Sequence, residues 1–167
     1  IIENLALAYR RGMKRGLNWA VTREEKAKYQ KALQELDLGL ENRMTSKVGL
    51  LSGGQRQALT LLMATMVTPK ILLLDEHTAA LDPATAAKVL ALTRQIIAER
   101  KITALMVTHN MHQALELGNR TLMMDAGSII FDVSGAEREK LTVDDLLEKF
   151  KENAGRQLDN DRILTSK

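Results

Sequence analysis

Residues 71–83 read ILLLDEHTAALDP, and this stretch decides the fold class. Four apolar residues in a row, ended by two carboxylates, are typical of a short strand buried on both faces. Pro83 stands where a helix would begin, and apolar residues recur at helical spacing from Val89 to Ile96. A second apolar run, residues 102–108, predicts another buried strand. Strand, helix and strand together predict a βαβ unit and therefore a parallel sheet covered by helices.

Two helices and a longer buried helix are predicted before this unit. Residues 2–11 form a short helical pattern, and Thr22 with Glu25 resembles a capping box at the start of a second helix. Gly39 is the expected end of that second helix. Residues 53–67 are apolar nearly all round, as in a buried helix. The apolar stripe predicted for the second helix consists of Tyr29, Leu33 and Leu36.

The last third of the chain predicts an edge hairpin and a closing helix. Residues 121–125 and 128–133 alternate as strands around Ala126-Gly127. Thr142 is a good N-cap for a helix, and from residue 151 onward the chain is a polar tail. We expect a helical part over 1–50, a central part over 51–118, and the hairpin with its helix over 119–150. The predicted apolar side of the closing helix consists of Val143, Leu146, Leu147 and Phe150.

Composition excludes several classes of function for a chain of 167 residues. The net charge is only +3, which does not indicate a general polyanion binder. There is no cysteine, which excludes disulfides, thiolate zinc sites and cysteine nucleophiles in this sequence. No run approaches the ~20 apolar residues that cross a bilayer. The first residue is Ile1, so we expect either processing or one piece of a longer protein.

Positive charge is concentrated in residues 10–31, which hold eight lysines and arginines against two glutamates. A solvated helical face is the simpler interpretation of this segment. The alternative is a surface that faces an anionic membrane.

Two groups of residues have the composition of a phosphate site. Asp75 and Glu76 end the first strand, and ligands of open α/β sheets bind beyond the carboxyl ends of strands. Two adjacent carboxylates there suit a divalent cation and a water molecule, or they simply reach solvent. Ser52 caps a helix whose first residues are Gly53 and Gly54, which exposes backbone N–H groups at a positive helix terminus. Such a terminus suits phosphate, although Ser-Gly-Gly also occurs in ordinary turns.

Taken together, these motifs resemble the nucleotide-binding domain of ABC (ATP-binding cassette) ATPases. Residues 51–55, LSGGQ, match the signature sequence, and residues 71–76 look like the Walker B strand with its catalytic glutamate. Residues 80–82 are similar to the D-loop, and His109 stands where the switch histidine does. Four motifs in this order make a chance resemblance improbable. The resemblance implies an α/β fold with a P-loop-NTPase-like parallel sheet and part of the helical subdomain at the N-terminus.

The resemblance also implies roles for these residues. Asp75 would hold Mg²⁺ through water, Glu76 would polarise the attacking water, and His109 would contact the γ-phosphate. The signature residues would bind ATP held by another subunit, and Leu81 and Asp82 would lie at the dimer interface. His77 departs from the proline that is most common after the glutamate, and its role is open. The implied signature residues are Ser52, Gly53, Gly54 and Gln55.

The phosphate-gripping loop of this family is absent from the sequence. No Gly-x-x-x-x-Gly-Lys-Ser/Thr occurs in the sequence. Residues 12–16 begin and end with glycine, but Leu17 follows them where the motif has lysine. We therefore expect the C-terminal portion of a cassette, which lacks the P-loop because that loop lies upstream of this sequence. This portion alone is expected to be inactive, and part of its βαβ core is expected to be exposed.

The resemblance implies the ATPase subunit of a membrane transporter that uses ATP and Mg²⁺. Its expected partners are a second ATPase subunit, as a homodimer or a pair, and separate permease subunits, with no nucleic acid. Its expected place is cytoplasmic, on the inner face of the cell membrane. Two alternatives stay open: a soluble ABC ATPase of chromosome maintenance or translation, and a degenerate cassette that regulates without hydrolysis.

Overall fold

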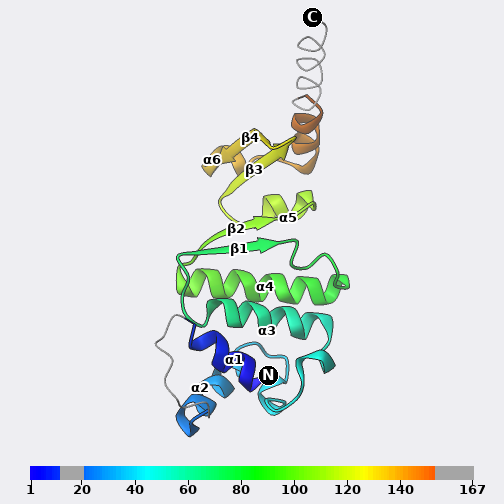
Figure 1. Ribbon diagram of the computed structural model, residues 1–167. Helices are drawn as coiled ribbons and strands as arrows, with labels where there is room; N and C mark the ends of the chain where they lie inside the picture. The colour runs from blue at the N-terminus through cyan, green and yellow to red at the C-terminus, as the bar shows by residue number, and fades with distance from the viewer. Residues whose placement is uncertain (12–20, 153–167) are drawn as a thin grey trace, which may run out of the picture. The chain divides into compact units, whose positions relative to one another are not determined.

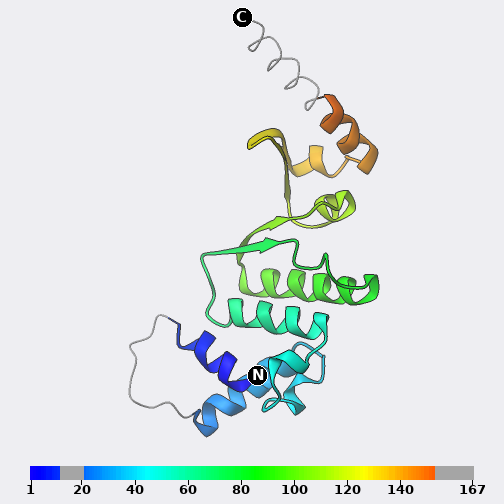
Figure 2. The ribbon, with the colours of Figure 1, turned by 45° about the vertical axis from the view of Figure 1, so that its right-hand side comes forward.

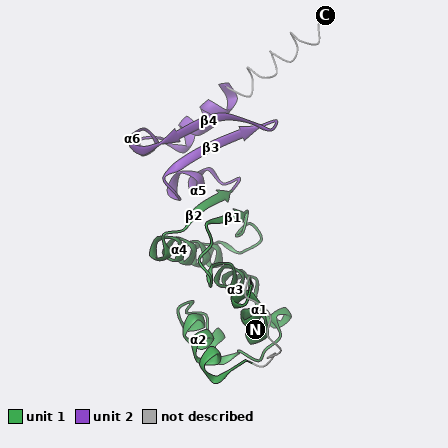
Figure 3. Ribbon diagram, turned by 60° about the vertical axis from the view of Figure 1, so that its left-hand side comes forward, with its two compact units in different colours: residues 1–107 green, residues 108–167 purple. Residues whose placement is uncertain are grey.

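The computed structural model describes residues 1–11 and 21–152, which form two compact units (Figure 3). The first unit ends at Val107 and the second begins at Thr108. Residues 12–16 lie outside the described residues. So does the predicted polar tail, except for residues 151 and 152.

Three helices and two short 3-10 turns build the helical part of the first unit. Helix α1 spans Ile2–Tyr9, α2 spans Arg23–Gln34, and the turns η1 and η2 span Leu40–Asn42 and Val48–Leu50. The third helix is α3, Gly53–Thr65. Their buried side chains meet in one cluster that includes Leu5, Tyr29, Leu33, Leu40 and Leu59.

Helix α2 begins where the sequence predicts and ends earlier. Thr22 accepts a hydrogen bond from the backbone N–H of Glu25, and the Glu25 carboxylate accepts one from the backbone N–H of Thr22, so the predicted capping box is confirmed. The predicted end at Gly39 is wrong, since α2 stops at Gln34. Gly39 instead has a φ of +69° and starts η1, a conformation that glycine adopts without a steric penalty.

The βαβ unit is confirmed and its sheet is parallel. Strand β1 spans Ile71–Asp75, helix α4 spans Pro83–Arg100, and strand β2 spans Thr103–Val107. The register pairs Ile71 with Thr103 and Asp75 with Val107. Helices α3 and α4 lie side by side beneath these strands (Figures 1 and 2). The core between the helices and the sheet consists of Leu61, Leu72, Leu74, Ile96 and Ile102.

The expectation that both strands are buried on both faces is wrong for the described residues. Leu72 and Leu74 point toward the helices and are buried, whereas Ile71 and Leu73 are 52% and 67% exposed. On β2, Leu105 and Val107 are also exposed. The physical reason is that, within the described first unit, helices cover one face of the sheet only. The exposure expected for part of the βαβ core is therefore present.

The second unit consists of short helices around a hairpin. It contains α5 (Met111–Glu116), β3 (Arg120–Asp125), β4 (Ser128–Ser134) and α6 (Gly135–Arg138). Strands β3 and β4 pair antiparallel, as predicted, and the turn at Ala126 and Gly127 has positive φ at both residues.

The closing helix of the second unit also begins where predicted. Residues 143–152 are helical, and Thr142 caps them through reciprocal hydrogen bonds with Asp145. Of its predicted apolar side, Leu146 is fully buried, whereas Leu147 and Phe150 are exposed. The stripe is therefore narrower than the pattern indicates, because the described part of this unit covers little of it.

Candidate functional site

The candidate site lies at one edge of the first unit, where the ends of two strands and two helices lie on the same side. Strands β1 and β2 run in the same direction, and α3 and α4 run opposite to them. The carboxyl ends of both strands and the amino ends of both helices therefore lie on the same side (Figure 1). Helix amino ends carry partial positive charge, and such an edge is where open α/β sheets bind ligands.

The signature residues form the amino end of α3. The Ser52 hydroxyl accepts a hydrogen bond from the backbone N–H of Gln55, and the Gln55 side-chain oxygen accepts one from the backbone N–H of Ser52, each at 3.2 Å. This is a second capping box, which the sequence analysis did not anticipate although Ser-x-x-Gln is its pattern. The Gln55 amide also donates to the carbonyl of Leu38, so Gln55 joins α3 to the helical part.

The two signature glycines pack against the segment predicted as the D-loop. A Cβ atom at Gly53 would lie 2.9 Å from Cδ2 of Leu81, and one at Gly54 would overlap Cγ2 of Thr85. Only glycine allows α3 and the start of α4 to come this close. The structure thus brings the signature and the D-loop together.

Asp82 is the N-cap of α4. Its carboxylate accepts a hydrogen bond from the backbone N–H of Thr85 at 3.0 Å, and Pro83 occupies the first helical position. Hydrogen bonds from the Thr85 side chain and backbone hold the pKa of Asp82 below its ordinary value. Asp82 is therefore anionic at the amino end of a helix, where its charge is favourable.

Asp75 and Glu76 stand at the carboxyl end of β1, and both are exposed. The backbone N–H of Glu76 donates to the carbonyl of Val107 at 3.0 Å, which ties this residue to the end of β2. Glu76 has a φ of +41°, a left-handed conformation that costs a non-glycine residue about 1–2 kcal/mol. Strain of this kind clusters at functional sites.

Asp75 is suited to bind Mg²⁺ as one ligand among several. Across the described residues, no three His, Asp or Glu side chains come together as a complete metal site. Mg²⁺ is usually bound by one or two carboxylates, waters and substrate phosphates, so an exposed Asp75 has the oxygen donor that this chemistry requires.

His77 is held against α4. Its Nε2 lies 3.2 Å from the Thr93 hydroxyl, which itself donates to the carbonyl of Val89 at 2.8 Å. Because the only proton of that hydroxyl is already used, Nε2 must carry the donated proton. Burial lowers the pKa of His77. Thr93, which the sequence analysis missed, has no local pattern that marks it as a partner of His77.

His109 belongs to the second unit and precedes α5. Asn110 caps this helix, since its side-chain oxygen accepts a hydrogen bond from the backbone N–H of Gln113 at 3.1 Å. The hydroxyl of Thr108 donates to the side-chain oxygen of Gln113 and accepts from the backbone N–H of Asn110. His109 is exposed between these two anchored residues.

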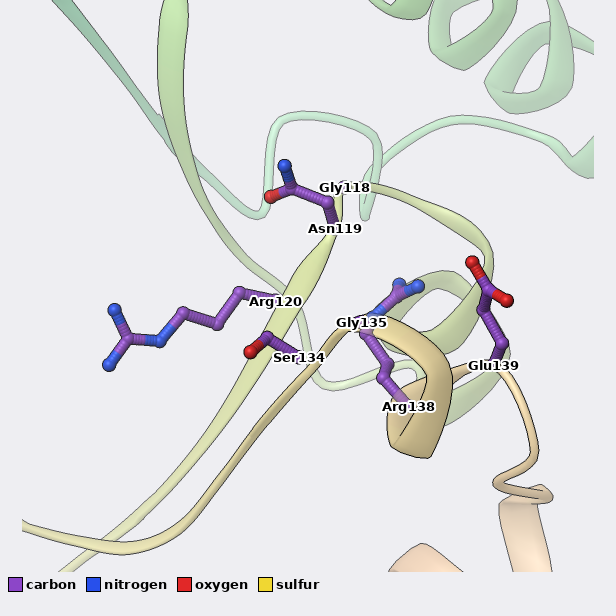
Figure 4. Close-up of a pocket in the computed structure, with 7 residues that line it drawn as sticks. All are labelled: Gly118, Asn119, Arg120, Ser134, Gly135, Arg138 and Glu139. Carbon is purple, nitrogen blue, oxygen red and sulfur yellow. The ribbon is translucent and has the colours of Figure 1, made fainter.

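A pocket of about 400 Å³ lies elsewhere in the second unit and contains none of the predicted site residues (Figure 4). It lies beside the start of β3, the end of β4 and α6, and Arg120, Ser134 and Arg138 are among the residues that line it. Arg120 points away from Arg138 and pairs with Asp132.

Comparison with known proteins agrees with these motifs. The family model described as "ABC transporter" matches residues 2–79. A tyrosine transport ATP-binding protein of Clostridioides difficile (strain R20291) is 46% identical over 148 residues, which cover 89% of this chain and 59% of that protein. This chain is a partial ABC nucleotide-binding domain.

Other ABC relatives show the same partial coverage. Methionine import ATP-binding protein MetN 2 of Oceanobacillus iheyensis (strain DSM 14371) is 39% identical over 110 residues, 66% of this chain and 32% of that protein. The chain therefore spans about three fifths or less of these relatives.

Solved structures confirm the ABC cassette fold. An ATP-binding cassette of an ABC transporter in its ADP conformation matches with a TM-score of 0.69 and 26% identity. The match covers 89% of this chain and 61% of the other. A metal-chelate type ABC transporter in an inward-facing conformation matches with a TM-score of 0.67 and 29% identity, covering 89% and 58%. In the described residues, no helix has both the length and the apolar character to cross a membrane.

Proposed function

We propose that this chain is part of the ATP-hydrolysing subunit of an ABC transporter and supplies its signature, Walker B, D-loop and switch residues. The observation that carries the proposal is the packing of Gly54 against Thr85. This packing joins the signature helix to the helix that begins with Asp82, at the edge where Asp75 and Glu76 end β1.

The proposed chemistry divides between two subunits. Asp75 holds Mg²⁺ through water, Glu76 polarises the attacking water, and His109 orients that water toward the γ-phosphate. The amino end of α3 in the other subunit receives the same γ-phosphate, since its N–H groups and helix dipole favour an anion. A solved relative described as a dimeric bacterial ABC transporter cassette supports this arrangement; it matches this chain with a TM-score of 0.59 and 29% identity.

The phosphate-gripping lysine and loop are not in this sequence, so the proposed reaction needs a P-loop from the intact cassette. Permease subunits are the proposed partners, and the cytoplasmic face of the membrane is the proposed place of action. Import is the proposed direction, because several relatives are named as import ATP-binding proteins.

The test is the Glu76→Gln variant of the intact cassette. Glutamine keeps the shape of the side chain and loses the charge that polarises water, so ATP should bind while most hydrolysis is lost. ATP should then hold two subunits together as a dimer during size-exclusion chromatography. Glu24→Gln, at an exposed position of α2, is the matched control and should hydrolyse ATP at the unmutated rate. Hydrolysis by Glu76→Gln at the unmutated rate would contradict the proposed role of Glu76, whereas no hydrolysis by the unmutated intact cassette would favour the regulatory cassette.

A further inference from the structure

Arg138 is a buried arginine outside the motifs considered above. It is only 8% exposed, and its guanidinium makes four hydrogen bonds. Nε donates to the hydroxyl of Thr121 at 2.8 Å. Nη2 donates to the carbonyls of Leu115 and Leu117, each at 2.7 Å, and of Ala114 at 3.3 Å. All these described partners are neutral oxygens, so the buried charge is compensated by carbonyl dipoles.

These carbonyls belong to the carboxyl end of α5. The last carbonyls of a helix have no partner within the helix and carry partial negative charge, which a cation stabilises. The Thr121 hydroxyl extends the arrangement, since it donates to the carbonyl of Ala114 at 2.8 Å while it accepts from Arg138. Arg138 and Thr121 thus attach the end of α5 to the hairpin and to α6.

The opposite end of α5 carries His109. Thr108 and Asn110, on either side of this histidine, are each hydrogen-bonded to Gln113. Only six residues form α5, and isolated helices shorter than about 12 residues are marginal in water. The position of the histidine backbone therefore depends on contacts that hold the helix at both ends.

We propose that Arg138 is a positioning residue that holds His109 in its working orientation through α5. This inference rests on the proposed role of His109 in hydrolysis. Arg138 itself touches no reacting group. Its planar fork reaches carbonyls and a hydroxyl at once, which the single ammonium of a lysine does not reproduce. Loss of this fork leaves the end of α5 without its buried partner and lets the histidine move.

The test is a double-mutant cycle in the intact cassette, with the ATPase rate as the readout. Arg138→Met should lower kcat about tenfold to a hundredfold, because small misplacements of a catalytic group cost that much. KM for ATP should change less than about twofold, since the residue does not contact nucleotide. In a His109→Ala background, Arg138→Met should have almost no further effect on kcat. Arg138→Lys should restore only a small part of the rate.

Arg120→Met is the matched control. Arg120 lies at the start of β3 and pairs with Asp132 through an exposed ion pair. The Arg120→Met variant should keep the unmutated ATPase rate, because it loses the same charge as Arg138→Met without loosening α5. Hydrogen exchange gives a second measurement: Arg138→Met should accelerate amide exchange over residues 110–117 and leave residues 71–107 unchanged.

The possible outcomes separate the two proposals. If His109→Ala hydrolyses ATP at the unmutated rate, the proposed function of His109 is wrong, and the catalytic part of this inference is overturned with it. If His109→Ala is slow but Arg138→Met lowers kcat equally in both backgrounds, only the positioning role is overturned. Unchanged exchange over residues 110–117 would also overturn it, even for a variant with a low rate. A variant that loses protection across the whole chain has unfolded globally and contradicts a local role.

Discussion

Gly54 and Thr85 are in such close contact that an alanine methyl group at position 54 would overlap Cγ2 of the threonine. This contact joins the amino ends of α3 and α4. At their other ends, the Arg100 guanidinium donates a hydrogen bond to the carbonyl of Thr65. The two helices are therefore held in register at both ends, and Ser52 and Asp82 cap their amino ends.

Gly54→Ala should destabilise the protein by about 1–3 kcal/mol, the usual cost of overpacking. The helix-propensity gain of alanine, at most about 1 kcal/mol, offsets little of this in the first turn of a helix. Thr85→Ser removes the obstructing methyl group, so the double variant should recover most of the loss. Urea unfolding measures both effects. Gly49→Ala is the control, since no atom lies within 4 Å of a Cβ there. Equal losses from the single and double variants would contradict the contact as the cause.

Ser52→Arg should prevent the ATP-dependent dimer that Glu76→Gln forms. A long side chain at the amino end of α3 would occupy the space proposed for the γ-phosphate of the partner. Size-exclusion chromatography of the Glu76→Gln/Ser52→Arg protein, with and without ATP, gives the readout.

Two controls separate this blockage from the loss of a helix cap. Ser52→Ala removes the cap without adding bulk and should cost about 1 kcal/mol of stability. Thr22→Ala removes the corresponding capping box of α2, away from the site. Thr22→Ala should still dimerise with ATP in the Glu76→Gln background, and Ser52→Ala should keep part of the dimer that Ser52→Arg loses, because it leaves the backbone N–H groups of α3 open. A dimer that persists in Ser52→Arg would rule out the proposed role of this helix end.

Glu76→Gly should raise stability while it abolishes most hydrolysis. Glycine relieves the cost of a positive φ, and its greater freedom in the unfolded chain offsets part of that gain, so about 0.5–1 kcal/mol is expected. Thermal unfolding and phosphate release measure the two effects. Ala126→Gly, at a φ of +44° in the hairpin turn, is the matched control and should gain stability without losing hydrolysis. A loss of stability in Glu76→Gly would show that its side chain stabilises the fold.

The ion pair between α1 and α2 should make stability depend on pH. Arg10 donates to both carboxylate oxygens of Glu25 at 2.9 Å. Hydrogen bonds from the Thr22 backbone and from Arg10 lower the pKa of Glu25. This contribution is therefore complete above the pKa of Glu25 in the unfolded chain, and it is lost as pH falls through the lower pKa of the folded state.

Glu25→Gln tests this dependence, because glutamine keeps the capping box and has no charge. The stability difference between the two proteins should be largest near neutral pH and should vanish in acid. Urea unfolding between about pH 3 and pH 7 provides the comparison. Glu24→Gln is the control on the exposed side of the same helix turn. A difference that does not vary with pH would exclude the ion pair as its source.

The chain Ile1–Lys167 by itself should show no ATPase above background. Most of the grip on the phosphates of ATP comes from a P-loop, and this sequence contains none. Phosphate release and nucleotide binding should both be measured beside the intact cassette. Robust turnover by the chain alone would contradict the proposed division of the site.

The first strand of the sheet could be predicted from the sequence, but the exposure of its two faces could not. The run 71–74 predicts a strand correctly, but the same run reads as buried on both faces. Burial depends on what packs against each face, and the described first unit places helices on one face only. The prediction for the end of α2 was wrong for a related reason. Gly39 is a good helix terminator, yet α2 ends at Gln34.

The sequence alone determined the local elements and the order of the motifs. Capping boxes, a proline at the start of a helix and a short apolar run act over a few neighbouring residues, so Thr22, Ser52 and Pro83 begin helices as expected. Tertiary structure decided the contacts between distant residues. Gly54 meets Thr85, His77 meets Thr93, and Arg138 reaches the end of α5. No periodicity encodes these pairs, because each one depends on how two separately formed elements pack in space.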